Sequence, residues 1–202
     1  KCTAAENEGD GYIVRAGSTK TIFDRGYADK NKGNGFLLEN SKDIFLYGSE
    51  PRVGLFIFHN QKSGIVVNNC QQVHIGNEGK GVNIVESGEQ AILVDGENTN
   101  DVHISSSMIM WQVNLFGKPG LVVKNGKNIL VGGYDATERN NFELGNSTGI
   151  RVEGEKTEVS IVNNLIGELE EYESGSQKWG NLYGILVLGR IGSVVIEKNT
   201  IN

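Results

Sequence analysis

An internal repeat of about 29 residues is the feature that most constrains what this chain can fold into. A short segment with a small first residue and alternating apolar residues begins at Gly35, Gly64, Ala91, Gly120, Gly149 and Gly184. Successive starts are 29, 27, 29, 29 and 35 residues apart, and a weaker copy begins at Gly11. Because a unit of this size can bury its apolar face only against its neighbours, the repeat predicts a solenoid.

Each repeat contains more than one strand-like segment. A second alternating segment follows nine to eleven residues after each start from Gly35 on, at 44–46, 73–75, 102–104, 129–131, 159–161 and 194–196. A third is found in four repeats, at 55–57, 82–84, 113–115 and 142–144. Apolar residues at every second position indicate strands rather than helices, and a propeller blade needs four strands and about 40–50 residues. The pattern therefore predicts coils of three short strands.

The composition agrees with an all-β coil. The 202 residues include 28 Gly and only 2 Pro, and Gly and Asn are concentrated where the predicted strands end. Gly and Asn tolerate the backbone conformations of tight corners, and the abundant Val and Ile pack well on a pleated sheet. We expect each strand to pair in parallel with its equivalent one repeat later, about 4.8 Å away. Val67, Val94, Val123 and Val152 should then form one interior column.

Three phrases of the sequence carry a resemblance to a known family. They are Val-His-Ile-Ser-Ser-Ser-Met-Ile at 102–109, Val-Ser-Ile-Val-Asn-Asn-Leu-Ile at 159–166 and Val-Val-Ile-Glu-Lys-Asn-Thr-Ile at 194–201. These phrases resemble the repeat of right-handed parallel β-helix proteins, the pectate-lyase-like superfamily, over about residues 11–202. The resemblance implies the fold and a set of usual activities: polysaccharide lyases, glycoside hydrolases, epimerases and phage tailspikes, most of them extracellular. The repeat describes coil geometry and does not by itself mark a site.

The repeat also predicts how the chain is divided. We expect one β-helix domain over 1–202, with a segment leading into it over 1–10 and an insertion loop over 167–183. About seven coils should start near 11, 35, 64, 91, 120, 149 and 184. Neither end has an amphipathic segment that could cap the solenoid, so we expect a fragment of a longer β-helix, capped by a further β-helix or domain of the same chain.

The charge balance limits the classes of partner. The chain has 19 basic and 25 acidic residues, a formal net charge of −6 and a sequence pI near 5.2. An acidic surface without a local basic patch argues against nucleic-acid binding. No apolar run approaches the roughly 18–20 residues of a membrane-spanning helix. A polysaccharide is the partner that the family resemblance implies, and the same resemblance places the protein outside the cell or on its surface.

The candidate catalytic residues lie on the outward side of the first strand, where the family resemblance implies a substrate groove. One outward column should contain Asp95, Lys124 and Glu153, and Arg151 belongs to the column beside it. In a glycoside hydrolase, Asp95 and Glu153 would be the two carboxyl groups. In a lyase, they would hold Ca²⁺ against a uronate while Lys124 or Arg151 abstracts a proton. The alternative is that a cation between two acids only avoids contact between like charges.

Other residues are candidates for substrate binding. Asn83 and Asn114 should stack on the third strand, where they could bind sugar hydroxyls or simply bond each other. The insertion supplies Tyr172, Trp179 and Tyr183, whose flat rings could stack on sugars or pack onto the coil. On the second strand we expect His74 and His103 to continue a ring stack that begins at Phe45 rather than bind a metal, and we expect His59 to stand alone in a loop.

Two functions are therefore compatible with the sequence. The first is a carbohydrate-active segment of an extracellular polysaccharide lyase or glycoside hydrolase, with Ca²⁺ as a possible cofactor. The signatures of polygalacturonase-like hydrolases and the acidic trio of typical pectate-lyase calcium sites are both absent. The second is a non-catalytic solenoid, such as an adhesin-like stalk or a tailspike-like homo-oligomer. Its support is the outward apolar column that contains Leu37, Val66, Leu93, Val122 and Leu186, which a monomer would normally cover.

Overall fold

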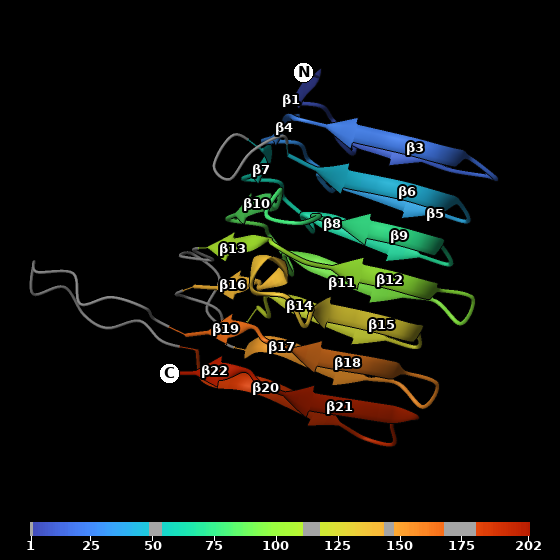
Figure 1. Ribbon diagram of the computed structural model, residues 1–202. Coiled ribbons are helices and arrows are strands. Elements are labelled where there is room, and N and C mark those ends of the chain that lie inside the picture. Colours follow the sequence, from blue (N-terminus) through green and yellow to red (C-terminus); the bar gives the residue numbers. More distant parts are fainter. Residues whose placement is uncertain (1, 49–53, 111–117, 144–147, 168–180) are drawn as a thin grey trace, which may run out of the picture.

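A computed structural model describes residues 2–48, 54–110, 118–143, 148–167 and 181–202. The chain is a right-handed parallel β-helix of about seven coils with three strands each. Figure 1 shows the coils descending in chain order, with the long strands from β3 (Thr19–Asp24) to β21 (Ser193–Glu197) stacked one below the other. The repeat therefore predicted the fold class correctly.

The strands form three parallel sheets, which we call first, second and third after the strand of each coil that enters them. The first sheet consists of β2 (Tyr12–Val14), β5 (Phe36–Glu39), β8 (Ile65–Asn68), β11 (Ile92–Asp95), β14 (Leu121–Lys124), β17 (Thr148–Glu153) and β20 (Tyr183–Leu188). The second consists of β3, β6 (Lys42–Tyr47), β9 (Gln71–Ile75), β12 (Asn100–Ile104), β15 (Lys127–Gly132), β18 (Glu158–Val162) and β21. The third consists of β1 (Cys2–Ala5), β4 (Gly26–Asp29), β7 (Leu55–Phe58), β10 (Val82–Val85), β13 (Met108–Met110), β16 (Asn141–Phe142), β19 (Leu165–Ile166) and β22 (Thr200–Ile201).

The predicted interior column is confirmed. Val67 pairs with Val94, Val94 with Val123, and Val123 with Val152, and all four side chains are fully buried. Along β5, β8 and β11 buried and half-buried residues alternate, as expected for strands with one face toward the core. β-Branched side chains suit this interior because their stiff rotamers fill the space between coils without losing freedom on folding.

The corner after each first strand is a left-handed turn. Asn40, Asn69, Gly96, Asn125 and Gly154 follow their strands at one-repeat spacing, and all have positive φ between 50° and 98°. Only Gly reaches this region freely, and Asn tolerates it better than other residues. The concentration of Asn and Gly in the sequence is thus explained by this corner.

The third sheet is larger than the sequence predicted. Residues 1–10, expected to lead into the helix, contain β1, which pairs with β4. The third strand of the fourth coil is β13 and not 113–115, so the predicted position was wrong. The error arose because the Val-Asn-Leu at 113–115 alternates like its neighbours, whereas the register places Met108 beside Asn83.

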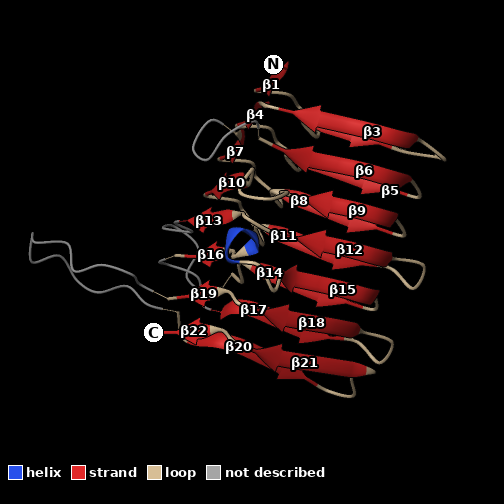
Figure 2. Cartoon of the chain, viewed as in Figure 1, coloured by secondary structure: helices blue, strands red, loops and turns tan. Residues whose placement is uncertain are grey.

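The insertion is shorter at its C-terminal end than predicted. Tyr183 is the first residue of β20 and pairs with Thr148, so it belongs to the first sheet rather than to a loop. Helical structure within the described residues is limited to the 3₁₀ turn η1 (Ala136–Glu138), the blue ribbon in Figure 2. No helix in the described ranges has the length and apolar character to cross a membrane.

Buried asparagines form hydrogen-bonded ladders inside the corner between the second and third sheets. Asn140 Nδ2 donates to Asn164 Oδ1 at 2.9 Å, and Asn164 Nδ2 donates to Asn199 Oδ1 at 3.0 Å. Asn164 Nδ2 also donates to the carbonyl of Val131 at 2.9 Å. Asn140 and Asn164 are fully buried and Asn199 is half-buried, so these bonds satisfy two amides that have no access to water.

We expect the Asn164→Ala variant to be less stable by about 1–3 kcal/mol, because the buried amide of Asn140 and the buried carbonyl of Val131 each lose a hydrogen-bond partner. Urea unfolding followed by circular dichroism measures the change. The matched control is Asn68→Ala on the half-buried outward side of β8, which should change stability by less than about 0.5 kcal/mol. Equal losses in the two variants would contradict the ladder's contribution.

Gly76 lies in the corner after β9, in close contact with the next coil. Its φ is +80°, and a Cβ atom there would lie 1.8 Å from the carbonyl oxygen of Ser105. Gly79 has the same φ of +80°, but nothing lies within 4 Å of a Cβ atom at that position. The two glycines therefore share one conformational requirement and differ in the available space.

We expect Gly76→Ala to destabilise the protein by about 1–3 kcal/mol more than Gly79→Ala, because only the first substitution forces the coils apart. Both variants place Ala in the same left-handed backbone conformation, so this cost cancels when their stabilities in thermal and urea unfolding are compared. A Gly79→Ala variant as unstable as Gly76→Ala would show that backbone conformation alone sets the requirement.

Candidate functional site

The outward columns of the first sheet lie where the sequence predicted them. Asp95 pairs with Asn68, and Lys124 pairs with Glu153 on the next coil. Arg151 occupies the neighbouring column and pairs with Leu186 below it. The parallel register thus brings all four candidate catalytic residues onto one surface of β11, β14 and β17.

These four side chains form two ion pairs. Lys124 Nζ lies 4.0 Å from Asp95 Oδ2, and Arg151 Nε lies 3.4 Å from Glu153 Oε2. The four side chains are 28–44% exposed. Partly exposed ion pairs of this kind contribute little to stability, so a ligand's charged group can replace one partner at small cost.

The carboxylates do not converge on a metal position. Asp95 Oδ1 accepts a hydrogen bond from the backbone N–H of Gly96, and its other oxygen faces Lys124. No group of three or more His, Cys, Asp or Glu side chains within the described ranges could hold a metal ion. The donor set around Asp95 and Glu153 therefore does not fit Ca²⁺, and we derive no step through this ion.

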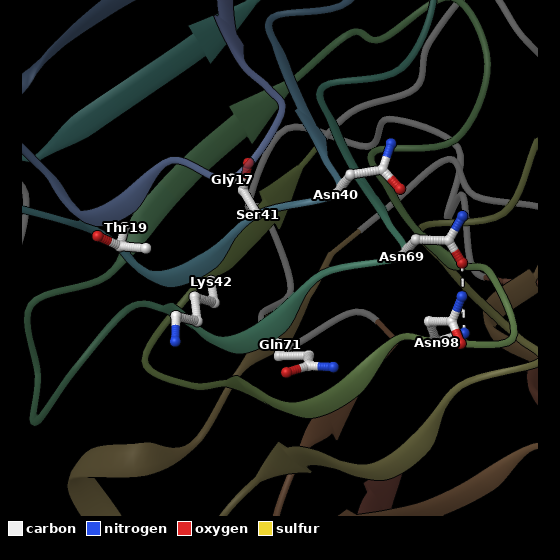
Figure 3. A pocket seen from close by; sticks show the side chains of 8 residues that line it. All are labelled: Gly17, Thr19, Asn40, Ser41, Lys42, Asn69, Gln71 and Asn98. Carbon is white, nitrogen blue, oxygen red and sulfur yellow. Dashed lines mark hydrogen bonds between the residues drawn. The ribbon is translucent and has the colours of Figure 1, made fainter.

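A polar groove adjoins this surface at the corner between the first and second sheets. Its volume is about 360 Å³, and it spans several coils. Figure 3 shows Asn40, Asn69 and Asn98 following one another along one side, with Thr19, Lys42 and Gln71 along the other. Asn40 and Asn69 directly follow Glu39 and Asn68, and Asn98 follows Asp95, so the groove lies beside the N-terminal part of this column and reaches the candidate residues at Asp95. Amides and hydroxyls in such a row suit the hydroxyl groups of a sugar chain.

The second sheet carries the predicted ring stack. Phe45 and His74 have centroids 4.9 Å apart with an angle of 6° between their planes, and His103 lies 6.1 Å from His74. His103 Nε2 lies 2.7 Å from the carbonyl oxygen of Gly132. Burial, and secondarily the neighbouring His103, lower the pKa of His74 below its ordinary value of 6.5. These contacts give both imidazoles a structural role in the packing of successive coils.

The third sheet holds a group that the sequence analysis missed. His59 does not stand alone: its Nδ1 lies 3.0 Å from Asp29 Oδ1 and its Nε2 lies 3.3 Å from Glu86 Oε2. Asp29 and Glu86 are one coil away on either side, at sequence separations of 30 and 27 residues. Glu86 stands one repeat after His59, and Asp29 is the strand residue next to Lys30, which stands one repeat before it. Comparing equivalent turns and their neighbouring residues across repeats would have found the group.

The predicted substrate-binding residues are distributed over different parts of the molecule. Asn83 faces outward from β10 between Phe56 and Met108, so Met108 occupies the place beside Asn83 that the sequence analysis gave to Asn114. Tyr183 is 50% exposed on β20. Asn114, Tyr172 and Trp179 lie outside the described residues.

The outward apolar column is less exposed than the sequence suggested. Leu37, Val66, Leu93 and Leu186 are half-buried, and Val122 in the middle of the column is only 1% exposed. This column is therefore not a continuous exposed apolar surface.

Comparisons with known proteins found no relative of this chain. No family model matches it, and neither a curated protein nor a solved structure matches it.

The lowered pKa of His74 predicts a pH dependence of stability. Below about pH 6.5 the unfolded chain takes up a proton at this position that the folded protein resists, so stability falls as pH decreases toward the folded-state pKa. The His74→Phe variant keeps a ring on Phe45 and should lose less stability than the parent between pH 7.5 and 5.5. Urea unfolding at both pH values measures the difference, and identical losses would contradict the assignment.

Proposed function

We propose that the chain is part of an extracellular carbohydrate-active β-helix that binds an acidic polysaccharide along its first sheet and cleaves it as a lyase. The observation that carries this proposal is the outward set Asp95, Lys124, Arg151 and Glu153: acid, base and acid follow on successive coils in one column, and Arg151 lies beside Glu153 in the next column. The resemblance of the repeat to pectate-lyase-like proteins supports the same class of substrate.

The binding path follows the axis of the β-helix. A linear polysaccharide repeats along its length, as the columns do, so its sugars can meet an equivalent polar group on each successive coil. The groove lined by Asn40, Asn69 and Asn98 supplies amides for hydroxyl groups, and Arg151 supplies positive charge for a uronate carboxylate.

The two cations have different roles in the proposed reaction. The guanidinium of Arg151 stays protonated and can hold a carboxylate with two parallel hydrogen bonds, so it positions the uronate. Lys124, in its neutral form, takes the proton from the carbon beside that carboxylate. The electrons of the broken C–H bond form a carbon–carbon double bond, and the glycosidic C–O bond on the next carbon breaks. Its electron pair goes to the leaving oxygen, which takes a proton from water.

Glycoside hydrolysis has less geometric support. A hydrolase needs two carboxyl groups that face each other across the scissile bond. Asp95 faces Lys124 and Glu153 faces Arg151, and the Lys124 position lies between the two acids along the column. The arrangement thus favours the reaction that uses the cations.

A non-catalytic glycan-binding solenoid is the second candidate. Its support is that each of the four charged side chains already has an opposite partner, which a purely structural column would also show. Binding of a polyuronate without cleavage would favour this second function.

The test is incubation with a panel of polyuronates and neutral polysaccharides, with the unsaturated product followed by its ultraviolet absorbance. We expect Lys124→Ala to lower kcat by about a hundredfold or more with little change in binding, and Arg151→Ala to weaken binding. The control is Lys156→Ala, an exposed lysine whose Nζ pairs with Glu97 Oε2 at 2.7 Å, which should act like the parent. No cleavage and no retention on any polysaccharide would overturn the proposed function.

A further inference from the structure

The outer face of the third sheet combines aromatic rings with polar groups over three consecutive coils. The register pairs Tyr27 of β4 with Phe56 of β7, and Phe56 with Asn83 of β10. Asp29 pairs with Phe58 in the neighbouring outward column. These residues come from a surface separate from the first sheet and from the polar groove.

The rings form one continuous apolar strip. Tyr27 and Phe56 stack with centroids 5.6 Å apart and planes at 14°, and Phe58 lies 5.5 Å from Phe56 at 35°. Phe58 also lies 6.1 Å from the imidazole of His59. All three aromatic side chains are half-buried, so part of the strip faces solvent.

A polar rim stands beside this strip. His59 is 47% exposed and is held between Asp29 and Glu86, whose side chains are 27% and 31% exposed. Each carboxylate contacts the imidazole with one oxygen, and Asp29 Oδ2 lies 3.8 Å from Lys30 Nζ. Lys30, His59 and Glu86 share the left-handed conformation with φ of 48–52°, which aligns equivalent turn residues of successive coils.

Rings beside fixed hydrogen-bonding groups suit a particular class of ligand. A pyranose presents C–H bonds on its faces and hydroxyl groups around its rim, so it can rest on an apolar strip while it bonds to carboxylates, imidazole and amide. The two carboxylates, Asp29 and Glu86, stand beside a single ammonium group, that of Lys30, and they repel a further negative charge. The rim therefore favours a neutral sugar over a uronate, whereas on the first sheet Lys124 and Arg151 match the two carboxylates in number.

We propose that Tyr27, Phe56 and Phe58, together with Asp29, His59 and Glu86, form a second glycan-binding site, selective for neutral pyranosides. The site rests on the proposed function only in that the ligand is a carbohydrate. It is separate from Lys124 and Arg151, and it binds whether or not the first sheet catalyses a reaction.

Nuclear magnetic resonance of the imidazole groups tests this site directly, because the chain contains only 3 histidines. Cello-, manno- and xylo-oligosaccharides serve as neutral probes, and oligogalacturonate as the acidic probe. We expect at least one neutral probe to shift the His59 signals while those of His74 and His103 stay in place. Oligogalacturonate should leave the His59 signals unchanged.

Variants give the second measurement. Glu86→Gln and Phe58→Ala should each weaken binding of the neutral probe by about tenfold in calorimetry. The control is Tyr134→Ala, which removes a 65% exposed aromatic ring outside the three-coil site and should not change affinity. Thermal unfolding checks each variant, and if Phe58→Ala fails to fold, Glu86→Gln carries the test.

The outcomes separate the two proposals. Binding of oligogalacturonate with no His59 shift by any neutral probe would overturn the second site and leave the lyase proposal standing. A His59 shift with no binding or cleavage of polyuronates would do the reverse. Neutral binding that survives both Glu86→Gln and Phe58→Ala would also overturn the second site.

Discussion

Parallel pairing of each coil with the next is the interaction on which the rest of this structure depends. It fixes the distance between equivalent residues of successive coils at about 4.8 Å. The neighbours of each residue are therefore its equivalents in the preceding and the following coil. Sequence separation of one repeat then becomes spatial contact. The buried valine column, the Phe45–His74 ring stack and the contact of His59 with Asp29 and Glu86 are three consequences of that rule.

The same spacing restricts what the interior can contain. Aliphatic side chains at this distance are in van der Waals contact, so an uninterrupted column such as Val67 to Val152 gains from every coil. A polar side chain is tolerated when the next coil supplies its partner, as Asn60 does for Asn31. Ser87, one repeat beyond Asn60, has a buried hydroxyl with no hydrogen-bond partner in the described part of the chain. The shorter side chain of Ser87 thus ends the hydrogen-bonded ladder of Asn31 and Asn60, and its buried hydroxyl without a partner lowers the stability of the fold.

The sequence predicted the first and second sheets well because apolar residues alternate clearly along their strands. The column of Asp95, Lys124 and Glu153 was predicted from spacing alone. A shift of one residue in register would turn each side chain to the other face of the sheet, so the buried alternate residues fix the register. The third sheet was harder because β16 and β19 have only two residues each, too few to show alternation. In the fourth coil two apolar segments competed for one place, and only the register selected Met108–Met110.

The prediction of the candidate site from the sequence was limited by a different factor. The ion pairs of Lys124 and Arg151 depend on side-chain direction, which strand spacing does not determine. His59 was overlooked because a turn residue has no alternating pattern, and its partners come from two other coils. Residues on turns become visible only when equivalent turns are compared across repeats, because the contact lies between coils and not within one.

The two proposed surfaces differ in how they use the repeat. On the first sheet, polar and charged side chains continue from Glu39 to Glu153, and the groove beside them crosses several coils. A ligand that repeats along its length gains a contact on each coil, so this surface suits an extended chain. On the third sheet the set of rings and rim groups is confined to β4, β7 and β10, and Met108 follows Asn83 on the next coil. The pattern stops after three coils, so a ligand gains nothing by extending further along the axis, and the face suits a short stretch of sugar.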